Sequence, residues 1–72
     1  MNAAEQRAQF VDALRSDSSG RIDLASGDDP ATVQRRLREA AYELGVRIES
    51  EWINPSQRAL QWRRIGRRAQ AP

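Results

Sequence analysis

The sequence contains no cysteine, no histidine and no lysine, and each absence limits what the chain can do. Without cysteine there is no disulfide, and without cysteine and histidine the common zinc sites lack their ligands. The commonest nucleophile–base pairs of enzymes need the same two residue types. No apolar run approaches the roughly 18 residues that a membrane span requires. We therefore expect a non-catalytic protein with no metal, no cofactor and no membrane-spanning segment.

Seventy-two residues suffice for one small domain and leave no room for a second core. A core of this size supplies only ~3–5 kcal/mol, so small domains commonly add a cross-link, a metal or a second copy. Because composition removes the first two, we expect a homodimer. The N-terminus shows no positively charged, hydrophobic leader of the secretory type, so we expect a cytoplasmic protein.

The charge is uneven along the chain. All twelve basic residues are arginine, and the net charge is +2. Residues 1–57 hold seven arginines against ten acidic residues, a balance of −3, whereas residues 58–72 hold five arginines and no acid, a balance of +5. An acidic body with a basic C-terminal end is the expected distribution.

Residues 29–44 carry the clearest helical signal. Asp29 suits the cap, because its carboxylate can accept from the first free backbone N–H groups, and Pro30 suits the first helical position. Gly45 stands where a left-handed residue would end the helix. Apolar residues recur at helical spacing between these signals and predict one buried stripe: Val33, Leu37, Ala40, Ala41 and Leu44.

Weaker patterns precede this main helix. Residues 1–15 read as an N-terminal helix with Phe10, Val11 and Leu14 on one side, and its diluted stripe predicts light packing or packing on another subunit. Residues 21–25 alternate between polar and apolar side chains and predict a short strand. We expect this strand to join a hairpin strand in parallel, through a right-handed crossover.

After the main helix the period changes from 3.6 to 2, and residues 46–65 predict a β-hairpin. Pairing Trp52 with Leu60 and pairing Trp52 with Trp62 both keep the apolar faces together, so the sequence leaves these two registers open. The chain is thus expected to form one small α+β domain over residues 1–65. Its order is α-β-α-β-β, with the amphipathic main helix packed on a mainly antiparallel sheet, and residues 66–72 are expected to be a basic, disordered tail.

Neither pair of neighbouring carboxylates predicts acid–base chemistry. Asp28 and Asp29 are better explained by helix capping. Glu49 and Glu51 share a strand face with Arg47, and we expect these three to form a solvated, salt-bridged surface. Nothing around either pair predicts the buried pocket that raises a carboxyl pKa for catalysis.

The strongest functional signal is the basic segment 58–68. Arginine-rich segments bind nucleic-acid backbones by releasing counterions and add two-pronged contacts to phosphate or guanine. A solubilising tail, with Arg63 paired to Glu49 or Glu51, explains the same residues. On the main helix, Arg38 and Tyr42 lie four residues apart and are the helix residues that we expect to contact a partner. DNA, or else RNA, is the expected partner, and the predicted contacts are Arg38, Arg58, Arg63, Arg64, Arg67 and Arg68.

A protein-interaction module is the competing hypothesis. Ile53 and Ile65 fall on the otherwise polar face of the predicted hairpin, where exposed apolar side chains favour a docking partner. Trp52 and Trp62 are suited to stack on single-stranded bases, but their phase with Leu60 favours the core.

Residues 30–37 also resemble the recognition helix of winged-helix regulators, and the hairpin that follows resembles a wing. This resemblance implies binding to DNA. The chain departs from the winged-helix pattern between Ala25 and Asp29, where there is no room for the supporting second helix.

Overall fold

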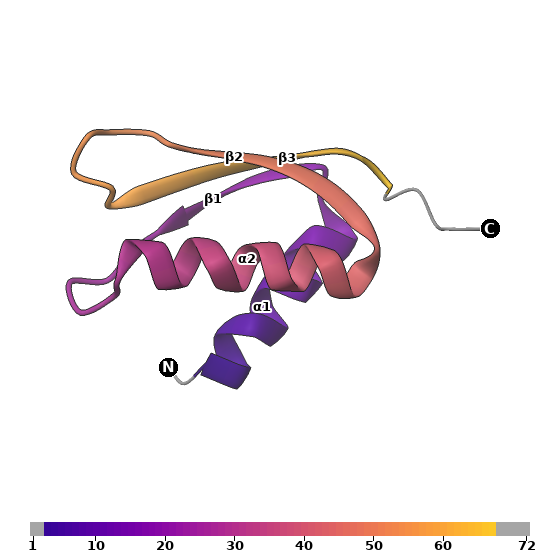
Figure 1. Cartoon of the computed structure of the whole chain (residues 1–72), viewed down its shortest axis with the longest axis horizontal. Coiled ribbons are helices and arrows are strands. Elements are labelled where there is room, and N and C mark those ends of the chain that lie inside the picture. The colour runs from indigo at the N-terminus through magenta and orange to yellow at the C-terminus, as the bar shows by residue number, and fades with distance from the viewer. Residues whose placement is uncertain (1–2, 68–72) are drawn as a thin grey trace.

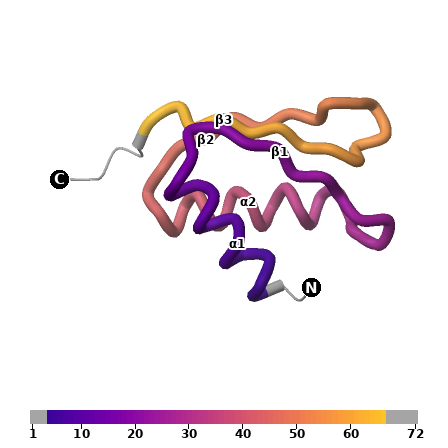
Figure 2. Tube along the Cα trace, turned by 180° about the vertical axis from the view of Figure 1, so that it is seen from behind, coloured from indigo at the N-terminus to yellow at the C-terminus, as the bar shows by residue number. Residues whose placement is uncertain are grey.

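The computed structural model describes residues 3–67, which form two helices and one three-stranded antiparallel sheet. Both helices lie on the same face of the sheet, and no described element covers the other face (Figures 1 and 2). The predicted α+β class and the order α-β-α-β-β are confirmed. The elements are α1 (Ala3–Ser16), β1 (Ser19–Asp23), α2 (Pro30–Leu44), β2 (Val46–Trp52) and β3 (Ala59–Arg67).

Helix α2 begins and ends where its sequence signals predict. The Asp29 carboxylate accepts from the backbone N–H of Thr32 at 3.0 Å and from its hydroxyl at 2.8 Å. Gly45 follows the helix with φ 70°, and its backbone N–H donates to the carbonyls of Ala41 and Tyr42. A left-handed conformation at this position favours glycine, because it has no Cβ. The cap, the stop and the apolar stripe together make α2 the central helix of the domain.

The core lies between the helices and the inner face of the sheet. Four residues of the predicted α2 stripe are buried, and they meet Leu60 and Trp62 of β3. Helix α1 packs more firmly than its sequence predicts, because Leu14 is fully buried and Phe10 is nearly so. The buried set of this core is Phe10, Leu14, Val33, Leu37, Ala40, Ala41, Leu60 and Trp62.

The first strand does cross over through α2 to a parallel hairpin strand, but the predicted direct pairing of these two strands is wrong. The strand order is β1-β3-β2, so the last strand of the sequence occupies the centre, and β1 pairs with it in antiparallel fashion. Strand β1 also begins two residues earlier than predicted and ends at Asp23. Strands β1 and β2 do run parallel to each other, as a β-α-β unit requires, but β3 lies between them. A long-range pairing of this kind depends on tertiary packing rather than on local sequence.

The hairpin takes the first of the two predicted registers. Trp52 lies opposite Leu60, and Glu49 lies opposite Arg63. One bulge interrupts the ladder, because Arg47 and Ile48 are consecutive on β2 while their partners, residues 66 and 64, are not consecutive on β3. Strand β3 continues through Gly66 to Arg67, two residues past the predicted end of the hairpin.

Trp62 is a core residue rather than an exposed stacking platform, with only 3% of its surface accessible. It lies opposite Gly20 on β1 and Ser50 on β2. A Cβ added at Gly20 would lie only 2.7 Å from the indole Nε1 of Trp62. The indole therefore occupies the space that a side chain on β1 would fill, and Trp52 is partly buried at the edge of the same core.

Candidate nucleic-acid interface

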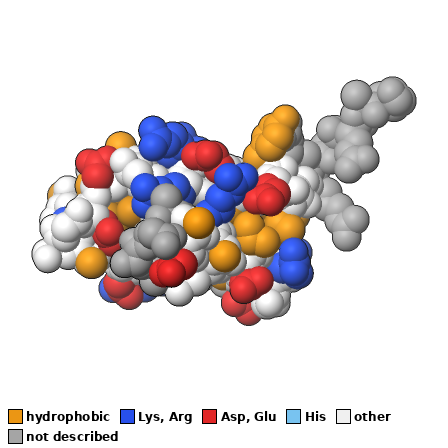
Figure 3. Space-filling model, turned by 90° about the horizontal axis from the view of Figure 1, so that it is seen from below, with side chains coloured by type: hydrophobic (Ala, Val, Ile, Leu, Met, Phe, Trp, Pro, Cys, Tyr) orange, Lys and Arg blue, Asp and Glu red, His pale blue; other side chains and the backbone are white. Residues whose placement is uncertain are grey.

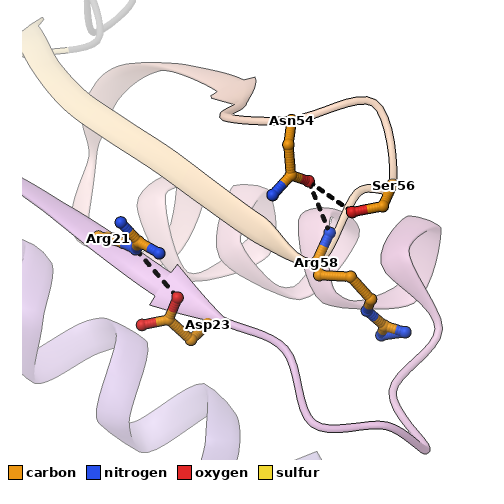
Figure 4. A network of polar contacts seen from close by, with 5 residues as sticks. All are labelled: Arg21, Asp23, Asn54, Ser56 and Arg58. Carbon is orange, nitrogen blue, oxygen red and sulfur yellow. Dashed lines mark hydrogen bonds and ion pairs between the residues drawn. The ribbon is translucent and has the colours of Figure 1, made fainter.

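The structure gives the predicted arginines different roles, beginning with Arg58. One terminal nitrogen of its guanidinium donates to the carbonyl oxygens of Ala25 and Asp28, both at 3.1 Å. Its backbone N–H donates to the Asn54 side chain, which also accepts from Ser56 (Figure 4). Arg58 thus connects the β2–β3 loop to the loop that precedes α2 through one terminal nitrogen of its guanidinium.

Arg64 has a comparable internal role at the other end of the sheet. It points from β3 toward the end of α1, where its guanidinium donates to the backbone carbonyls of Leu14 and Asp17. Carbonyls in the last turn of a helix lack intrahelical partners and carry partial negative charge, so a cation there is favourable. Arg64 satisfies these carbonyls and attaches α1 to the central strand.

Arg63 points to the opposite, uncovered face of the sheet. Its guanidinium forms an ion pair with Glu49 at 2.6 Å, and both side chains are mostly exposed. The expected three-residue surface of Arg47, Glu49 and Glu51 therefore forms differently, because Glu49 pairs across the strands and Glu51 accepts from Gln61.

The backbone of Arg67 closes β3 opposite Val46, and Arg68 lies outside the described residues. In Figure 1 the end of β3 and the turn between α2 and β2 lie at the same end of the molecule. Strand β3 therefore ends beside the start of β2.

Arg38 and Arg47 lie together in a groove that no acidic side chain lines. Both line a shallow groove between the second half of α2 and the start of β2, with Tyr42 at its rim and apolar side chains along its floor. Neither side chain forms a hydrogen bond or ion pair with another described residue. Arg15 shares this property within residues 3–67 but lies on α1, outside the groove. The groove is lined by Arg38, Ala41, Tyr42, Val46, Arg47 and Ile48.

Sequence reasoning missed Arg47, because its position on a strand face with two glutamates predicted a salt bridge. The register of β2 against β3 identifies Arg47 as an unpaired charge. Glu49 lies opposite Arg63 across the ladder, whereas Arg47 lies opposite Gly66, which offers no side chain. The cross-strand partner, rather than the neighbour on the same strand, decides which charge is paired.

The other exposed charges on the helices largely pair with one another. Arg7 on α1 contacts Glu43 on α2 at 3.2 Å, and Arg35 contacts Glu39 one turn along α2 at 3.7 Å. Arg36 donates to the side chain of Gln6. The helix-bearing side accordingly shows basic and acidic side chains interspersed (Figure 3). The groove between α1 and α2 is therefore close to electrically neutral, unlike the groove of Arg38 and Arg47.

Among the described residues no three acidic side chains gather where they would hold a metal ion. Neither described helix is long and apolar enough to cross a membrane. The pKa of Asp29 lies below its ordinary value, because the Thr32 hydroxyl and backbone N–H donate to the carboxylate. This shift belongs to the helix cap and not to a reactive centre.

Comparison with known proteins gives no match: no family model, curated protein or solved structure is significantly similar to this chain.

Proposed function

We propose that this protein is a small, non-catalytic nucleic-acid-binding protein, and that it binds through the end of the domain where α2, β2 and β3 meet. The observation that carries the proposal is the shared groove of Arg38 and Arg47, two arginines without a carboxylate partner among the described residues. Strand β3 ends beside this groove at Arg67, and Arg68 follows in the sequence.

The contacts of the other arginines support this choice of surface. Arg58 and Arg64 each donate from one terminal nitrogen to backbone carbonyls, which holds their guanidinium groups inside the domain. Arg63 would have to leave Glu49. Arg38 and Arg47 are exposed and have no carboxylate partner to give up among the described residues. We therefore expect these two arginines to contribute most to the affinity for nucleic acid.

A salt series tests the proposal. We expect log K for a labelled oligonucleotide to fall linearly with log salt, because each neutralised phosphate releases condensed counterions. The double variant Arg38→Gln/Arg47→Gln should flatten the slope by about 1.4–1.8, which corresponds to two lost phosphate contacts.

The matched control is Arg21→Gln/Arg35→Gln. It removes the same charge from two exposed arginines that already pair with Asp23 and Glu39. We expect the slope of log K against log salt to change little in the control variant. An equal loss in both double variants would show that net charge alone drives binding, and an affinity independent of salt would refute the proposal.

A protein-interaction module is the second candidate, favoured by the uncovered face of the sheet. Ile65 on β3 and Ile53, directly after β2, have 45% and 43% of their surfaces exposed. Light scattering coupled to size exclusion tests this candidate together with the expected homodimer. A monomer that binds neither DNA nor RNA would favour a protein partner over the nucleic-acid proposal.

A further inference from the structure

The groove of Arg38 and Arg47 differs from a plain phosphate-binding surface, because an aromatic ring stands at its rim. Tyr42 has 68% of its surface exposed, the largest exposure among the described large apolar or aromatic side chains. It follows Arg38 by four residues on α2, so ring and guanidinium project from the same side of the helix. The floor beside them is apolar, formed by Ala41, Val46 and Ile48.

We infer that this groove binds single-stranded nucleic acid, with one base stacked on Tyr42 and the adjoining phosphates contacted by Arg38 and Arg47. The inference rests on the proposed function and names its ligand class. Single strands expose the faces of their bases, and a stacked base gains ~1–3 kcal/mol on an aromatic side chain whatever its identity. A duplex hides those faces and presents phosphates and groove edges instead.

The surroundings of the groove also favour a single strand over a duplex. Reading a duplex commonly requires an exposed helix face that enters the major groove. The exposed side of α2 carries Glu39 and Glu43, paired with Arg35 and Arg7, and would bring carboxylates toward the phosphates.

The edge position of β2 also favours binding of a single strand. Because β2 pairs only with β3, its other side presents backbone N–H and C=O groups that no described strand uses. Val46, Arg47 and Ile48 of this strand line the groove, and the unused backbone groups of an edge strand are suited to hydrogen-bond with unpaired bases without selecting one base.

The test compares single strands of DNA and RNA, each about 12 nucleotides long, with the duplex of the same sequence by fluorescence anisotropy at one salt concentration. We expect at least one single strand to bind roughly tenfold more tightly than the duplex. Tyr42→Leu should weaken single-strand binding by about fivefold or more, since it removes the stacking face, whereas Tyr42→Phe should retain it.

Ile53→Ala is the control for loss of an exposed apolar side chain, because Ile53 lies outside the groove. Thermal melts of all three variants establish that each is folded. Equal binding of duplex and single strand, or equal affinity of Tyr42→Leu and Tyr42→Phe, would overturn this inference while leaving the proposed function intact. Failure to bind either form would overturn both.

Discussion

Gly20 is the position where the absence of a side chain matters most to the sheet. Its Cα faces the indole of Trp62, and a Cβ built there would lie 2.8 Å from the ring carbons Cε2 and Cζ2. Separations this short force one partner to move, and Trp62 is held by core residues on its other sides. The approach of β1 to the central strand therefore depends on glycine at this position.

We expect Gly20→Ala to lower the free energy of unfolding by about 1–3 kcal/mol, the usual cost of overpacking. Gly27→Ala is the matched control, because a Cβ there meets no atom within 4 Å. Thermal denaturation followed by tryptophan fluorescence would measure both variants. Equal melting temperatures would show that Trp62 can turn aside without cost.

Asp29 offers a second test, because its carboxylate caps α2. Its folded pKa lies below the ordinary value of 3.8, so its contribution to stability is complete above that pH and is lost as the pH falls through the lower folded pKa. We expect Asp29→Ala to lower the melting temperature by a few degrees at pH 7 and by less in stronger acid.

Asp29→Asn separates the cap from the charge, since asparagine still accepts the hydrogen bonds of Thr32 but does not titrate. This variant should melt close to the wild type at pH 7 and show less acid sensitivity. Melting curves of the three proteins between pH 7 and pH 2.5 would measure the difference. If the melting temperatures of all three proteins fell equally with pH, carboxylates other than Asp29 would dominate the loss of stability in acid.

The helices and strands differ in how far local sequence determines them. Helix α2 is predictable because cap, proline, apolar stripe and glycine all fall within one continuous segment. The hairpin is predictable because its two strands are neighbours in the sequence, although turn and charge pattern left two registers open. The position of β1 is not predictable in this way, because its partner β3 begins 36 residues after β1 ends (residues 23 and 59).

The candidate site shows the same division. Arg38 could be identified from its place on α2, since helical spacing shows which charges have acidic neighbours. The internal roles of Arg58 and Arg64 could not, because the carbonyls that they contact belong to loops and to a helix end far along the chain. Arg47 required the register of β2 against β3.

Arg64 is expected to stabilise the packing of α1 against the sheet. Arg64→Met removes the donors to Leu14 and Asp17 and should lower the free energy of unfolding by about 1.5–3 kcal/mol, the range for hydrogen bonds to a charged group. Arg63→Met, on the neighbouring residue, breaks an exposed ion pair and should cost no more than about 1 kcal/mol.

Chemical denaturation measures both variants, and hydrogen exchange in the last turn of α1 should accelerate in Arg64→Met alone. If Arg63→Met proved the more destabilising of the two, the role assigned to Arg64 would be wrong.

For the molecule as a whole, the absence of histidine, cysteine and lysine gives an unusually constant charge. Side chains of these types supply most of the titration of proteins between about pH 6 and 11, and this sequence has none of them. We expect affinity for nucleic acid to change less than about twofold between pH 6 and pH 9, since arginine stays charged throughout. Anisotropy titrations at constant ionic strength would measure this, and a marked fall within that range would point to a contribution other than arginine.

The central place of β3 has a consequence for how the protein is made. A ribosome produces α1, β1 and α2 before the strand on which the sheet is built, so β1 lacks its hydrogen-bonding partner until the last described residues have been synthesised. Pairing between distant segments also slows folding, because a long loop must close before its contacts form. Nascent chains that stop before residue 59 should therefore remain sensitive to protease, and protection should arise in one late step after β3 has emerged.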